Sequence, residues 1–313
     1  MGDAPPAAGR TGTPLILEIK GNSLDDGPGI RTVVFFKGCP LSCAWCHNPE
    51  SKKVGPELSF DPRECAGCGL CIETCPRGAI DDSIEAHVDR SRCDLCFECV
   101  ETCPSGALSR VGREMSVGEV AAVVEKDLPF FRTSGGGVTL SGGEPTLFMD
   151  YCSRLLARLK EMGVHTILET CGLFDADAFV RTVLPHLDAV YFDLKLYDPA
   201  EHRRWCGTGN ETVLANFAEL MRAGLEGGVE VLPRIPLIPG ITATDENLEA
   251  LAELLRGAGA ERVALLEYNP LWLEKTAKVG GRNPLAGRDA SDRWMERSDV
   301  ERCRAAFEAF ELA

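Results

Sequence analysis

Residues 38–48 read Gly-Cys-Pro-Leu-Ser-Cys-Ala-Trp-Cys-His-Asn, which gives Cys39, Cys43 and Cys46 the spacing C-x3-C-x2-C. We call this stretch the cluster loop. A structural zinc ion is enclosed by four protein ligands, whereas the cluster loop offers only three thiolates. Thiolates also hold [4Fe–4S] clusters, which are normally bound by four cysteines. Three closely spaced cysteines therefore predict a [4Fe–4S] cluster with one iron left open for chemistry. A structural zinc loop and three unrelated cysteines are the alternatives.

Two more cysteine runs follow within residues 51–111, the insert. Residues 65–76 and 93–104 both have the spacing C-x2-C-x2-C-x3-C-P, and similar residues follow each run. This is the bacterial ferredoxin pattern, in which the fourth cysteine binds the other cluster. The expected ligand sets are Cys65, Cys68, Cys71 and Cys103 for one [4Fe–4S] cluster, and Cys93, Cys96, Cys99 and Cys75 for the other. The recurrence favours pseudo-twofold packing over the alternative of two zinc ribbons.

The other four of the fifteen cysteines lie outside these motifs. They are Cys152, Cys171, Cys206 and Cys303. A free cysteine usually behaves as a small buried hydrophobic residue, and we expect the same here. Disulfides are not expected, because the chain is long and shows no secretory signal.

The overall composition indicates a globular protein of ordinary apolar content, 44%, with a net charge of −15 over 313 residues. The negative charge argues against binding a nucleic acid. No apolar run approaches the roughly 18 residues that a membrane span needs. Residues 1–14 are rich in Gly, Ala and Pro and are expected to form a disordered tail. We expect a cytoplasmic monomer.

Outside the insert, apolar β-type segments alternate with amphipathic helical segments about six times. Such alternation predicts right-handed βαβ units and a parallel sheet. Six units favour an open α/β barrel over a closed one with eight units. The predicted barrel comprises residues 15–50 and 112–313. The expected strands are 15–19, 32–36, 137–143, 165–170, 189–195, 229–235 and 262–268, and the expected helices are 116–128, 149–162, 175–184, 210–222, 245–256 and 299–310.

Polar residues follow several of these strands, at the edge where α/β proteins bind ligands. Gly142 and Gly143 would let a ligand approach the backbone closely, although a plain β-turn is the alternative. Asp193 and Lys195 are two residues apart and would face the same way on a strand; a salt-bridged barrel interior is the other reading. Pro233 and Pro236 predict that their strand lies at a sheet edge or is irregular.

The cluster loop resembles the C-x3-C-x-aromatic-C signature of radical S-adenosylmethionine (SAM) enzymes, with Trp45 as the aromatic residue. The flanking Asp-Gly-Pro-Gly-Ile-Arg at 26–31 and His-Asn-Pro-Glu at 47–50 narrow the resemblance to the activating enzymes of glycyl radical enzymes. The similarity extends from about residue 14 to the C-terminus. It implies a partial (β/α)6 radical SAM barrel with an inserted ferredoxin-like domain that carries two further [4Fe–4S] clusters.

The resemblance also implies which residues bind SAM. The GGEP-like segment, the arginine of R-I-P-L-I-P-G and the lysine after the fourth strand match family positions. The resemblance implies a catalytic role for Lys195 together with the three cluster-loop cysteines. The implied SAM contacts are Trp45, Asn48, Gly142, Gly143, Glu144, Glu169, Asp193, Lys195 and Arg234. Glu169, Thr170, Asp193 and the carbonyl of Tyr191 are implied to hold Na⁺ or K⁺. Many relatives have a histidine at Asn269, so no SAM contact is assigned to this residue.

The implied activity is reductive cleavage of SAM to methionine and a 5′-deoxyadenosyl radical, which abstracts hydrogen from a backbone glycine of a partner glycyl radical enzyme. Flavodoxin or ferredoxin is the expected electron donor. The partner is expected among decarboxylases, lyases and dehydratases, which these motifs do not distinguish. Two alternatives remain at this point: a radical SAM enzyme acting on a small molecule or peptide, and an electron-transfer iron–sulfur protein.

Overall fold

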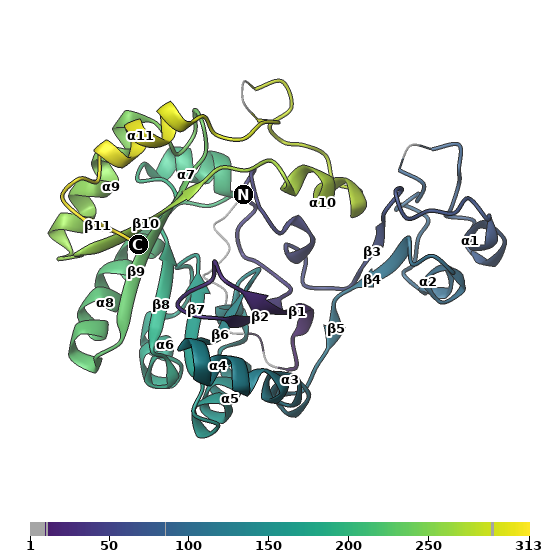
Figure 1. Cartoon of the computed structure of the whole chain (residues 1–313). Helices are drawn as coiled ribbons and strands as arrows, with labels where there is room; N and C mark the ends of the chain where they lie inside the picture. The colour runs from purple at the N-terminus through teal and green to yellow at the C-terminus, as the bar shows by residue number, and fades with distance from the viewer. Residues whose placement is uncertain (1–9, 11, 85, 289–290) are drawn as a thin grey trace.

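The computed structural model describes residues 10, 12–84, 86–288 and 291–313, so most of the predicted tail at 1–14 lies outside the described residues. The larger body is built on a sheet of nine strands in the order β11-β10-β9-β8-β7-β6-β2-β1-β5 (Figure 1). These strands are β1 (Leu15–Ser23), β2 (Arg31–Phe36), β5 (Arg113–Glu114), β6 (Gly137–Gly142), β7 (His165–Thr170), β8 (Ala189–Asp193), β9 (Glu230–Leu237), β10 (Arg262–Glu267) and β11 (Glu311–Leu312).

The strands β2, β6, β7, β8, β9 and β10 are neighbours and run parallel, which confirms the predicted α/β sheet. β1 pairs antiparallel with β2, so the first predicted strand forms a hairpin with the second and begins no crossover. The sheet has two separate ends, at β5 and β11. β11 also pairs parallel with β10 at one end, and the six longer parallel strands are the core of an open barrel.

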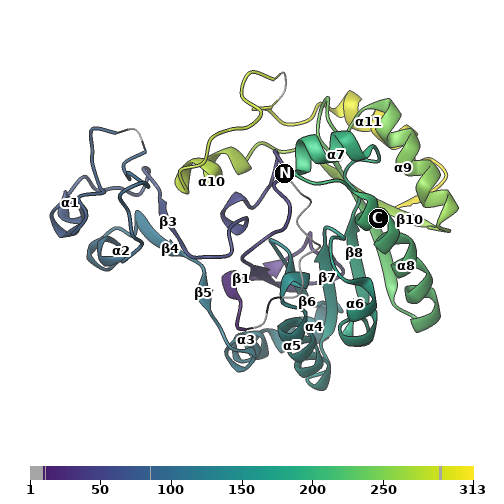
Figure 2. The ribbon, with the colours of Figure 1, turned by 180° about the vertical axis from the view of Figure 1, so that it is seen from behind.

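Helices cover the outer face of this sheet, as Figures 1 and 2 show from opposite sides. Their apolar stripes supply the main core; in one helix Leu155, Leu156 and Leu159 are fully buried. The helices are α3 (Val117–Val124), α4 (Leu128–Ser134), α5 (Met149–Glu161), α6 (Ala176–Thr182), α7 (Pro199–Cys206), α8 (Glu211–Gly227), α9 (Asp245–Gly257), α10 (Trp272–Lys278) and α11 (Arg297–Ala305). The short 3-10 turns are η1 (Pro49–Ser51), η2 (Glu125–Asp127), η3 (Pro145–Phe148) and η4 (Leu184–His186). None of the described helices is long and apolar enough to cross a membrane.

The predicted N-terminus of the first barrel helix has the expected geometry. The Ser116 hydroxyl accepts a bond from the backbone N–H of Glu119, whose carboxylate accepts the backbone N–H of Ser116 in return. This capping box satisfies two donors that an uncapped helix end leaves open. The helices α7 and α10 were not predicted, because each is short and carries little apolar periodicity.

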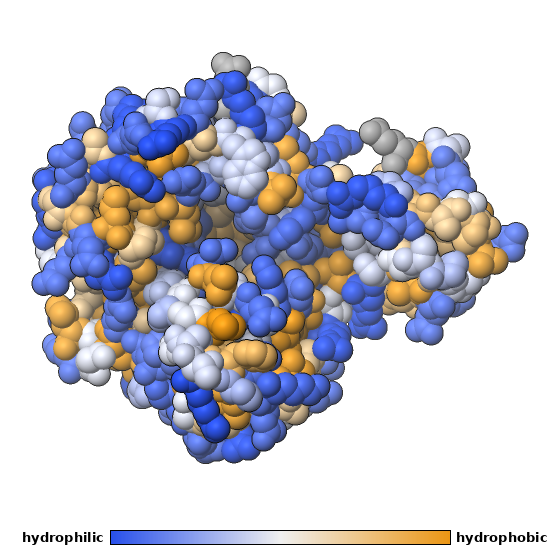
Figure 3. Space-filling view, viewed as in Figure 1, coloured by the Kyte–Doolittle hydropathy of each residue, from blue (hydrophilic) through white to orange (hydrophobic). Residues whose placement is uncertain are grey.

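The insert projects from the side of the larger body as a separate lobe (Figure 3). It contains a two-stranded antiparallel sheet and two short helices. These elements are β3 (Glu57–Phe60), β4 (Leu108–Val111), α1 (Leu70–Thr74) and α2 (Glu98–Thr102). A small apolar core that includes Leu58 and Leu108 lies among them.

The two cysteine runs of the insert have matching backbones. Residues 67, 69 and 78 have φ angles of 67°, 74° and 53°, and the positions 28 residues later, 95, 97 and 106, have 61°, 65° and 73°. The offset of 28 is that between Cys65 and Cys93 (93 − 65). A positive φ is uncommon for residues other than glycine, so its recurrence at Leu95 and Phe97 reflects the shared local fold. The backbone agrees with the pseudo-twofold packing that the repeat predicted.

The two prolines of β9, Pro233 and Pro236, predicted a strand that lies at a sheet edge or is irregular. The edge position was wrong, because β9 lies between β8 and β10. Each proline lacks one N–H and therefore forfeits only one ladder bond. Residues between and beside them keep the pairing: Arg234 is in register with both Asp193 and Ala264, and its carbonyl accepts the N–H of Leu194 at 2.9 Å. An internal strand can tolerate the two gaps because its neighbours hold it on both sides.

Candidate active site

A cavity of about 740 Å³ lies where the parallel strands meet the cluster loop. Its volume is in the range of sites for cofactors and small molecules. Predicted residues from five separate strand ends or loops line it together. They are Cys39, Cys43, Trp45, Cys46, Asn48, Gly142, Gly143, Glu169, Thr170, Asp193, Lys195 and Arg234. The chain folds so that residues almost 200 positions apart in sequence share one cavity.

The cluster loop is held in place mainly by backbone contacts. The N–H of Ser42 donates to the carbonyl of Cys206 at 2.8 Å, and that of Ala44 to the carbonyl of Trp205 at 2.9 Å. The ammonium of Lys52 donates to the carbonyl of Cys43 at 2.9 Å. The end of α7 therefore supports the loop from one side. This contact fixes the backbone while leaving the three cysteine side chains on the cavity wall.

The three thiols of the cluster loop sit in different electrostatic surroundings. A hydrogen bond from Cys206 lowers the pKa of Cys43 to about 7, and the charges of Lys195 and Lys52 act in the same direction. Burial raises the pKa of Cys46 to about 12. Thiolates are the form that binds iron, so nearby ammonium groups favour the ligand form. Three cysteines on one cavity wall, with cations beside them, are a donor set suited to an iron–sulfur cluster.

A compact charge network lines the cavity next to the cluster loop. Arg234 Nε and Nη2 each lie 2.8 Å from Oδ1 of Asp193, and Nη1 donates to Oε1 of Glu169. Lys195 Nζ lies 3.3 Å from Oδ2 of Asp193, and the Ser141 hydroxyl donates to Glu169 at 2.6 Å. Two cations thus face two carboxylates. The network is balanced in charge and rich in groups that can bind an amino acid.

The pKa directions in this network follow from burial and partners. Burial raises the pKa of Glu169, and Arg234 opposes this only in part. Burial would also raise the pKa of Asp193, but the charges of Arg234 and Lys195 outweigh it and hold the value below normal. Burial disfavours the charged form of Lys195, yet the Asp193 carboxylate raises its pKa above the usual value. Asp193 is accordingly the stronger anionic partner of the two acids.

Glu144, an expected SAM contact, binds protein groups in this structure. Its side chain is completely buried and is absent from the cavity wall. One carboxylate oxygen accepts the hydroxyls of Thr146 and Thr170 at 2.8 and 2.9 Å, and the other accepts the N–H of Cys171 at 2.7 Å. Glu144 therefore ties the end of β6 to the end of β7. Tyr191 also lies off the cavity wall, with its ring 5.6 Å from the Arg234 guanidinium.

The neighbouring glycines explain the local fold at the end of β6. Gly142 has a φ of 107°, and a Cβ added to Gly143 would lie 2.1 Å from the carbonyl oxygen of Gly38. A side chain at Gly143 would push the end of β6 away from the cluster loop, and one at Gly142 would clash with the backbone of Phe36 in β2. The Gly-Gly pair thus allows the two segments to touch.

The structure adds residues to the site that sequence reasoning left out. Cys171 lines the cavity, and Cys206 hydrogen-bonds Cys43, although both were predicted only as buried hydrophobic residues. His47 Nε2 lies 2.6 Å from the side-chain oxygen of Asn269. The other additions to the wall include Asp25, Asp26, Tyr268 and Trp294. The one sequence signal for Cys171 was its position immediately after the last residue of β7.

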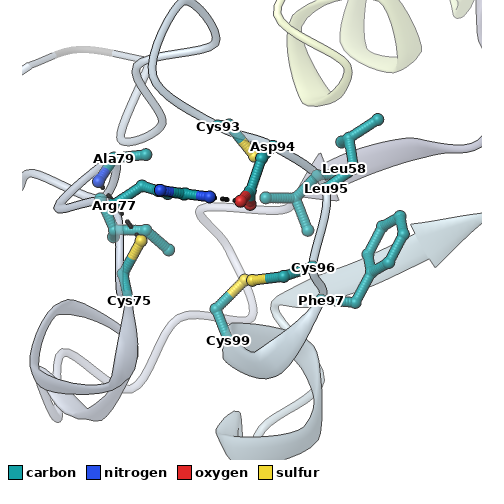
Figure 4. Close-up of a pocket in the computed structure, with 11 residues that line it drawn as sticks. Leu58, Cys75, Arg77, Ala79, Cys93, Asp94, Leu95, Cys96, Phe97 and Cys99 are labelled. Carbon is teal, nitrogen blue, oxygen red and sulfur yellow. Dashed lines mark hydrogen bonds and ion pairs between the residues drawn. The ribbon is translucent and has the colours of Figure 1, made fainter.

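The eight cysteines of the insert fall into two groups of four. One small cavity is lined by Cys75, Cys93, Cys96 and Cys99 (Figure 4), and a second by Cys65, Cys68, Cys71 and Cys103. These are the two crossed sets that the ferredoxin pattern predicts. Within the described part of the chain, no three His, Cys, Asp or Glu side chains converge closely enough to hold a single metal ion. The sulfurs of each set instead surround a space.

Three protein-family models match the chain. Residues 90–255 match the radical SAM superfamily, residues 57–104 a 4Fe-4S dicluster domain, and residues 25–74 a 4Fe-4S single cluster domain. The first match covers more than half of the chain, and the second falls on the insert. The chain thus matches both a radical SAM family model and a model of a domain with two 4Fe-4S clusters.

Curated relatives give the family more closely. The chain is 38% identical over 297 residues to the (2S)-3-sulfopropanediol sulfolyase activating enzyme of Bilophila wadsworthia, covering 93% of this chain and 97% of the relative. It is 40% identical over 270 residues to the trans-4-hydroxy-L-proline dehydratase activating enzyme of Clostridioides difficile, covering 85% and 88%. The chain belongs to the radical SAM activating enzymes of glycyl radical enzymes.

This activase shares its fold with more distant enzymes. A radical SAM methyltransferase from Sphaerobacter thermophilus aligns with a TM-score of 0.52 at 16% identity, covering 96% of this chain and 76% of that one. At such low identity the likeness concerns the fold alone. The family assignment confirms the activase function predicted from the cluster loop and its flanking motifs, and it displaces the alternative of a simple electron carrier.

Proposed function

We propose that this activase generates a glycyl radical in a partner enzyme, and that the 740 Å³ cavity is where SAM and the partner's glycine meet. One observation carries the proposal: the three thiols of the cluster loop and the polar ends of four strands line the same cavity. When bound, the cluster and SAM supply a 5′-deoxyadenosyl radical, with methionine as the other product, and this radical removes hydrogen from a backbone glycine. The chain's own residues bind, orient and shield these groups.

In the proposed arrangement, Cys39, Cys43 and Cys46 bind a [4Fe–4S] cluster and leave one iron open. The thiols fit this role because they share a wall of the cavity and have Lys52 and Lys195 nearby, whose charges favour thiolates. Trp45 is almost completely buried beside them and excludes water from this wall. Shielding matters because a radical must be kept from side reactions.

For SAM, we propose that Arg234 and Lys195 bind the carboxylate of its methionyl part. A guanidinium suits a carboxylate because its planar fork can donate two parallel bonds. Gly142 and Gly143 offer backbone to the same part of the molecule, and Asn48 lies on the wall near the cluster loop. Glu144, whose carboxylate is fully engaged by protein donors, positions the ends of β6 and β7 in this proposal.

A monovalent cation is part of the proposed site. Glu169, Thr170 and Asp193 lie on the cavity wall, and the carbonyl of Tyr191 is on the same strand as Asp193. In this structure Arg234 donates hydrogen bonds to the carboxylates of Asp193 and Glu169, and Ser141 donates one to Glu169. If SAM draws Arg234 towards its own carboxylate, Na⁺ or K⁺ can take the vacated positions beside the two acids. SAM affinity should then depend on which alkali cation is present.

The insert is proposed to carry two more [4Fe–4S] clusters, three in all, which pass electrons from flavodoxin or ferredoxin towards the cluster loop. Each has four cysteines and therefore no open iron for SAM. Cys65, Cys68 and Cys96 are exposed, which gives an external donor a short approach.

The test is anaerobic reconstitution followed by three measurements on one sample: iron content, SAM binding and 5′-deoxyadenosine formation. We expect about twelve iron atoms per chain from three four-iron clusters, and SAM cleavage that needs a strong reductant. A glycyl radical should appear in the EPR spectrum when a glycyl radical enzyme encoded beside this activase is added. Cleavage without any radical on such partners would reject the proposed protein substrate, while absence of cleavage would reject the site.

A further inference from the structure

One buried histidine of the insert faces a predicted cluster ligand. His87 is about 6% exposed and lies in the loop between Ile80 and Val88, which form an isolated β-bridge. Its Nε2 is 3.6 Å from the sulfur of Cys71. The contact belongs to the cavity lined by Cys65, Cys68, Cys71 and Cys103. No part of the proposed SAM chemistry uses this histidine.

The imidazole ring is fixed on its other sides. Its Nδ1 is 2.9 Å from a carboxylate oxygen of Asp82. The ring stacks on Phe60 of β3, with centroids 4.1 Å apart and an interplanar angle of 18°. The backbone of His87 has a φ of 57°, a conformation that histidine adopts more readily than most residues. Asp82, Phe60 and the residue's own backbone conformation therefore direct Nε2 at the sulfur.

The second cysteine group lacks an equivalent contact. The cavity of Cys75, Cys93, Cys96 and Cys99 has no histidine among its described lining residues. Cys75 instead accepts the backbone N–H of Ala79 at 3.3 Å. Arg77, which also lines this cavity, pairs with Asp94 at 2.6 Å (Figure 4). The backbones of the two runs match, but the polar surroundings of their sulfurs do not.

An iron-bound thiolate has no proton and can only accept, so a contact with Nε2 is favourable when that nitrogen donates. A hydrogen bond donated to a cluster sulfur raises the cluster's reduction potential, because it stabilises the state with one more electron. The contact with His87 should therefore raise the potential of the cluster that Cys71 helps to bind.

We propose that His87 donates a hydrogen bond to Cys71 and sets the reduction potential of the cluster on Cys65, Cys68, Cys71 and Cys103 above the value it would have without this bond. The inference rests on the proposed assignment of these four cysteines to one cluster. Reduction adds one electron from the flavodoxin or ferredoxin donor and breaks no bond. His87 acts as a positioning residue that makes this cluster easier to reduce than it would be without the bond.

The experiment uses the full chain with the three cluster-loop cysteines changed to alanine, so that only the insert clusters remain. Midpoint potentials are measured by EPR-monitored redox titration in this background and after adding His87→Phe, His87→Gln or Asp82→Asn. Phenylalanine keeps the stack on Phe60 and removes both donors, and Phe97 shows that an aromatic residue is accommodated at φ 65°. Glutamine restores one donor. Asp94→Asn, beside the other cysteine group, is the matched control.

We expect His87→Phe to lower one midpoint potential by about 59 mV, which is a tenfold change in a one-electron equilibrium. The other potential should stay unchanged. His87→Gln and Asp82→Asn should give smaller shifts in the same direction, and Asp94→Asn should leave this cluster unaffected. Unchanged potentials, or equal shifts of both clusters, would overturn the inference.

Two further outcomes separate this inference from the proposed function. A background chain that binds fewer than two clusters by iron content refutes the ligand assignment itself, and the role of His87 falls with it. If the His87→Phe protein is the only variant that loses the cluster, the Asp82→Asn variant provides the test. That variant keeps the imidazole ring and changes only the residue that orients it. An unshifted potential in Asp82→Asn would then reject the hydrogen bond as proposed, because the bond depends on a ring that Asp82 orients.

Discussion

Replacing Arg234 by alanine tests the proposed SAM site most directly. The guanidinium is only 11% exposed and now contacts the carboxylates of Asp193 and Glu169. In the proposed complex it would also bind the SAM carboxylate. Truncation removes that bond and leaves Lys195 as the one described cation that contacts Asp193. Binding and stability are therefore both expected to fall, and they must be measured separately.

The loss of binding can be estimated from the type of bond. A hydrogen bond to a charged group contributes about 1.5–3 kcal/mol, which corresponds to a rise in the SAM Kd of roughly 10- to 150-fold. Leaving a buried carboxylate without its partner costs about 3–5 kcal/mol of stability in comparable cases. Arg234→Lys keeps the charge and loses the planar fork, so we expect an intermediate Kd.

The assay is isothermal titration of anaerobically reconstituted protein with SAM, paired with thermal unfolding of the same samples. Arg262→Ala is the matched control, because Arg262 lies on the neighbouring strand β10, pairs with Glu230 at 2.6 Å and is 43% exposed. It is not part of the cavity wall. A folded Arg234→Ala protein that binds SAM within twofold of the Arg262→Ala control would remove Arg234 from the site.

Three other outcomes are expected. Changing the three cluster-loop cysteines to alanine should remove about a third of the iron, one cluster of three, and abolish 5′-deoxyadenosine formation; surviving cleavage would contradict the central assignment. Replacing Cys68 and Cys96 with alanine should spare most cleavage driven by a strong chemical reductant and abolish most of it with flavodoxin, whereas equal loss with both reductants would indicate a folding or docking defect. Asp188 has a lowered pKa because the bonds from Lys160 and the N–H of Thr166 outweigh burial, so its stabilising effect is present above the unfolded pKa and is lost as pH falls through the folded value. Asp188→Asn should accordingly flatten the loss of thermal stability between about pH 5 and pH 3, and an unchanged acid profile would show that this carboxylate contributes nothing.

Much of the site was predictable because its chemistry is encoded locally. The cysteine spacings are short-range patterns, and strand periodicity places residues such as Asp193 and Arg234 at the same edge of a parallel sheet. In this register the two residues face each other directly, and the structure brings their side chains to 2.8 Å. Periodicity and strand order were sufficient for this part of the site.

Other features depend on contacts between distant segments, which periodicity does not contain. Cys206 reaches Cys43 because α7 ends against the cluster loop, and α7 is a short helix with a weak sequence signal. Glu144 was expected to contact SAM because the GGEP-like segment resembles a family motif, and in the structure its carboxylate accepts bonds from donors at the end of β7. A carboxylate next to a binding motif can serve the ligand or the scaffold. Only the packing of β6 on β7 distinguishes the two.

The position of the insert in the chain has a consequence for electron transfer. The insert begins directly after the cluster loop, so its base must lie close to the proposed SAM cluster. The fully buried Lys37, just before the loop, donates to Glu57 of β3 at 2.7 Å and to the carbonyl of Glu50 at 2.5 Å. This pair lies at the junction of barrel and insert, and Lys53 also pairs with Glu57 at 2.8 Å.

A second junction is made by α10. Lys278 pairs with Asp61 of the insert at 2.6 Å, while Lys275 donates to the side chain of Asn48 and the carbonyl of His47 at 3.1 and 3.2 Å. Each exposed ion pair contributes little by itself. Together with the buried pair of Lys37, however, they attach the insert at two separate places, and one of these also holds the cluster loop. Attachment at two places is what the proposed electron relay requires, because a relay needs a constant separation from the active site, whereas a lobe that only captured a partner would function equally well on a flexible tether.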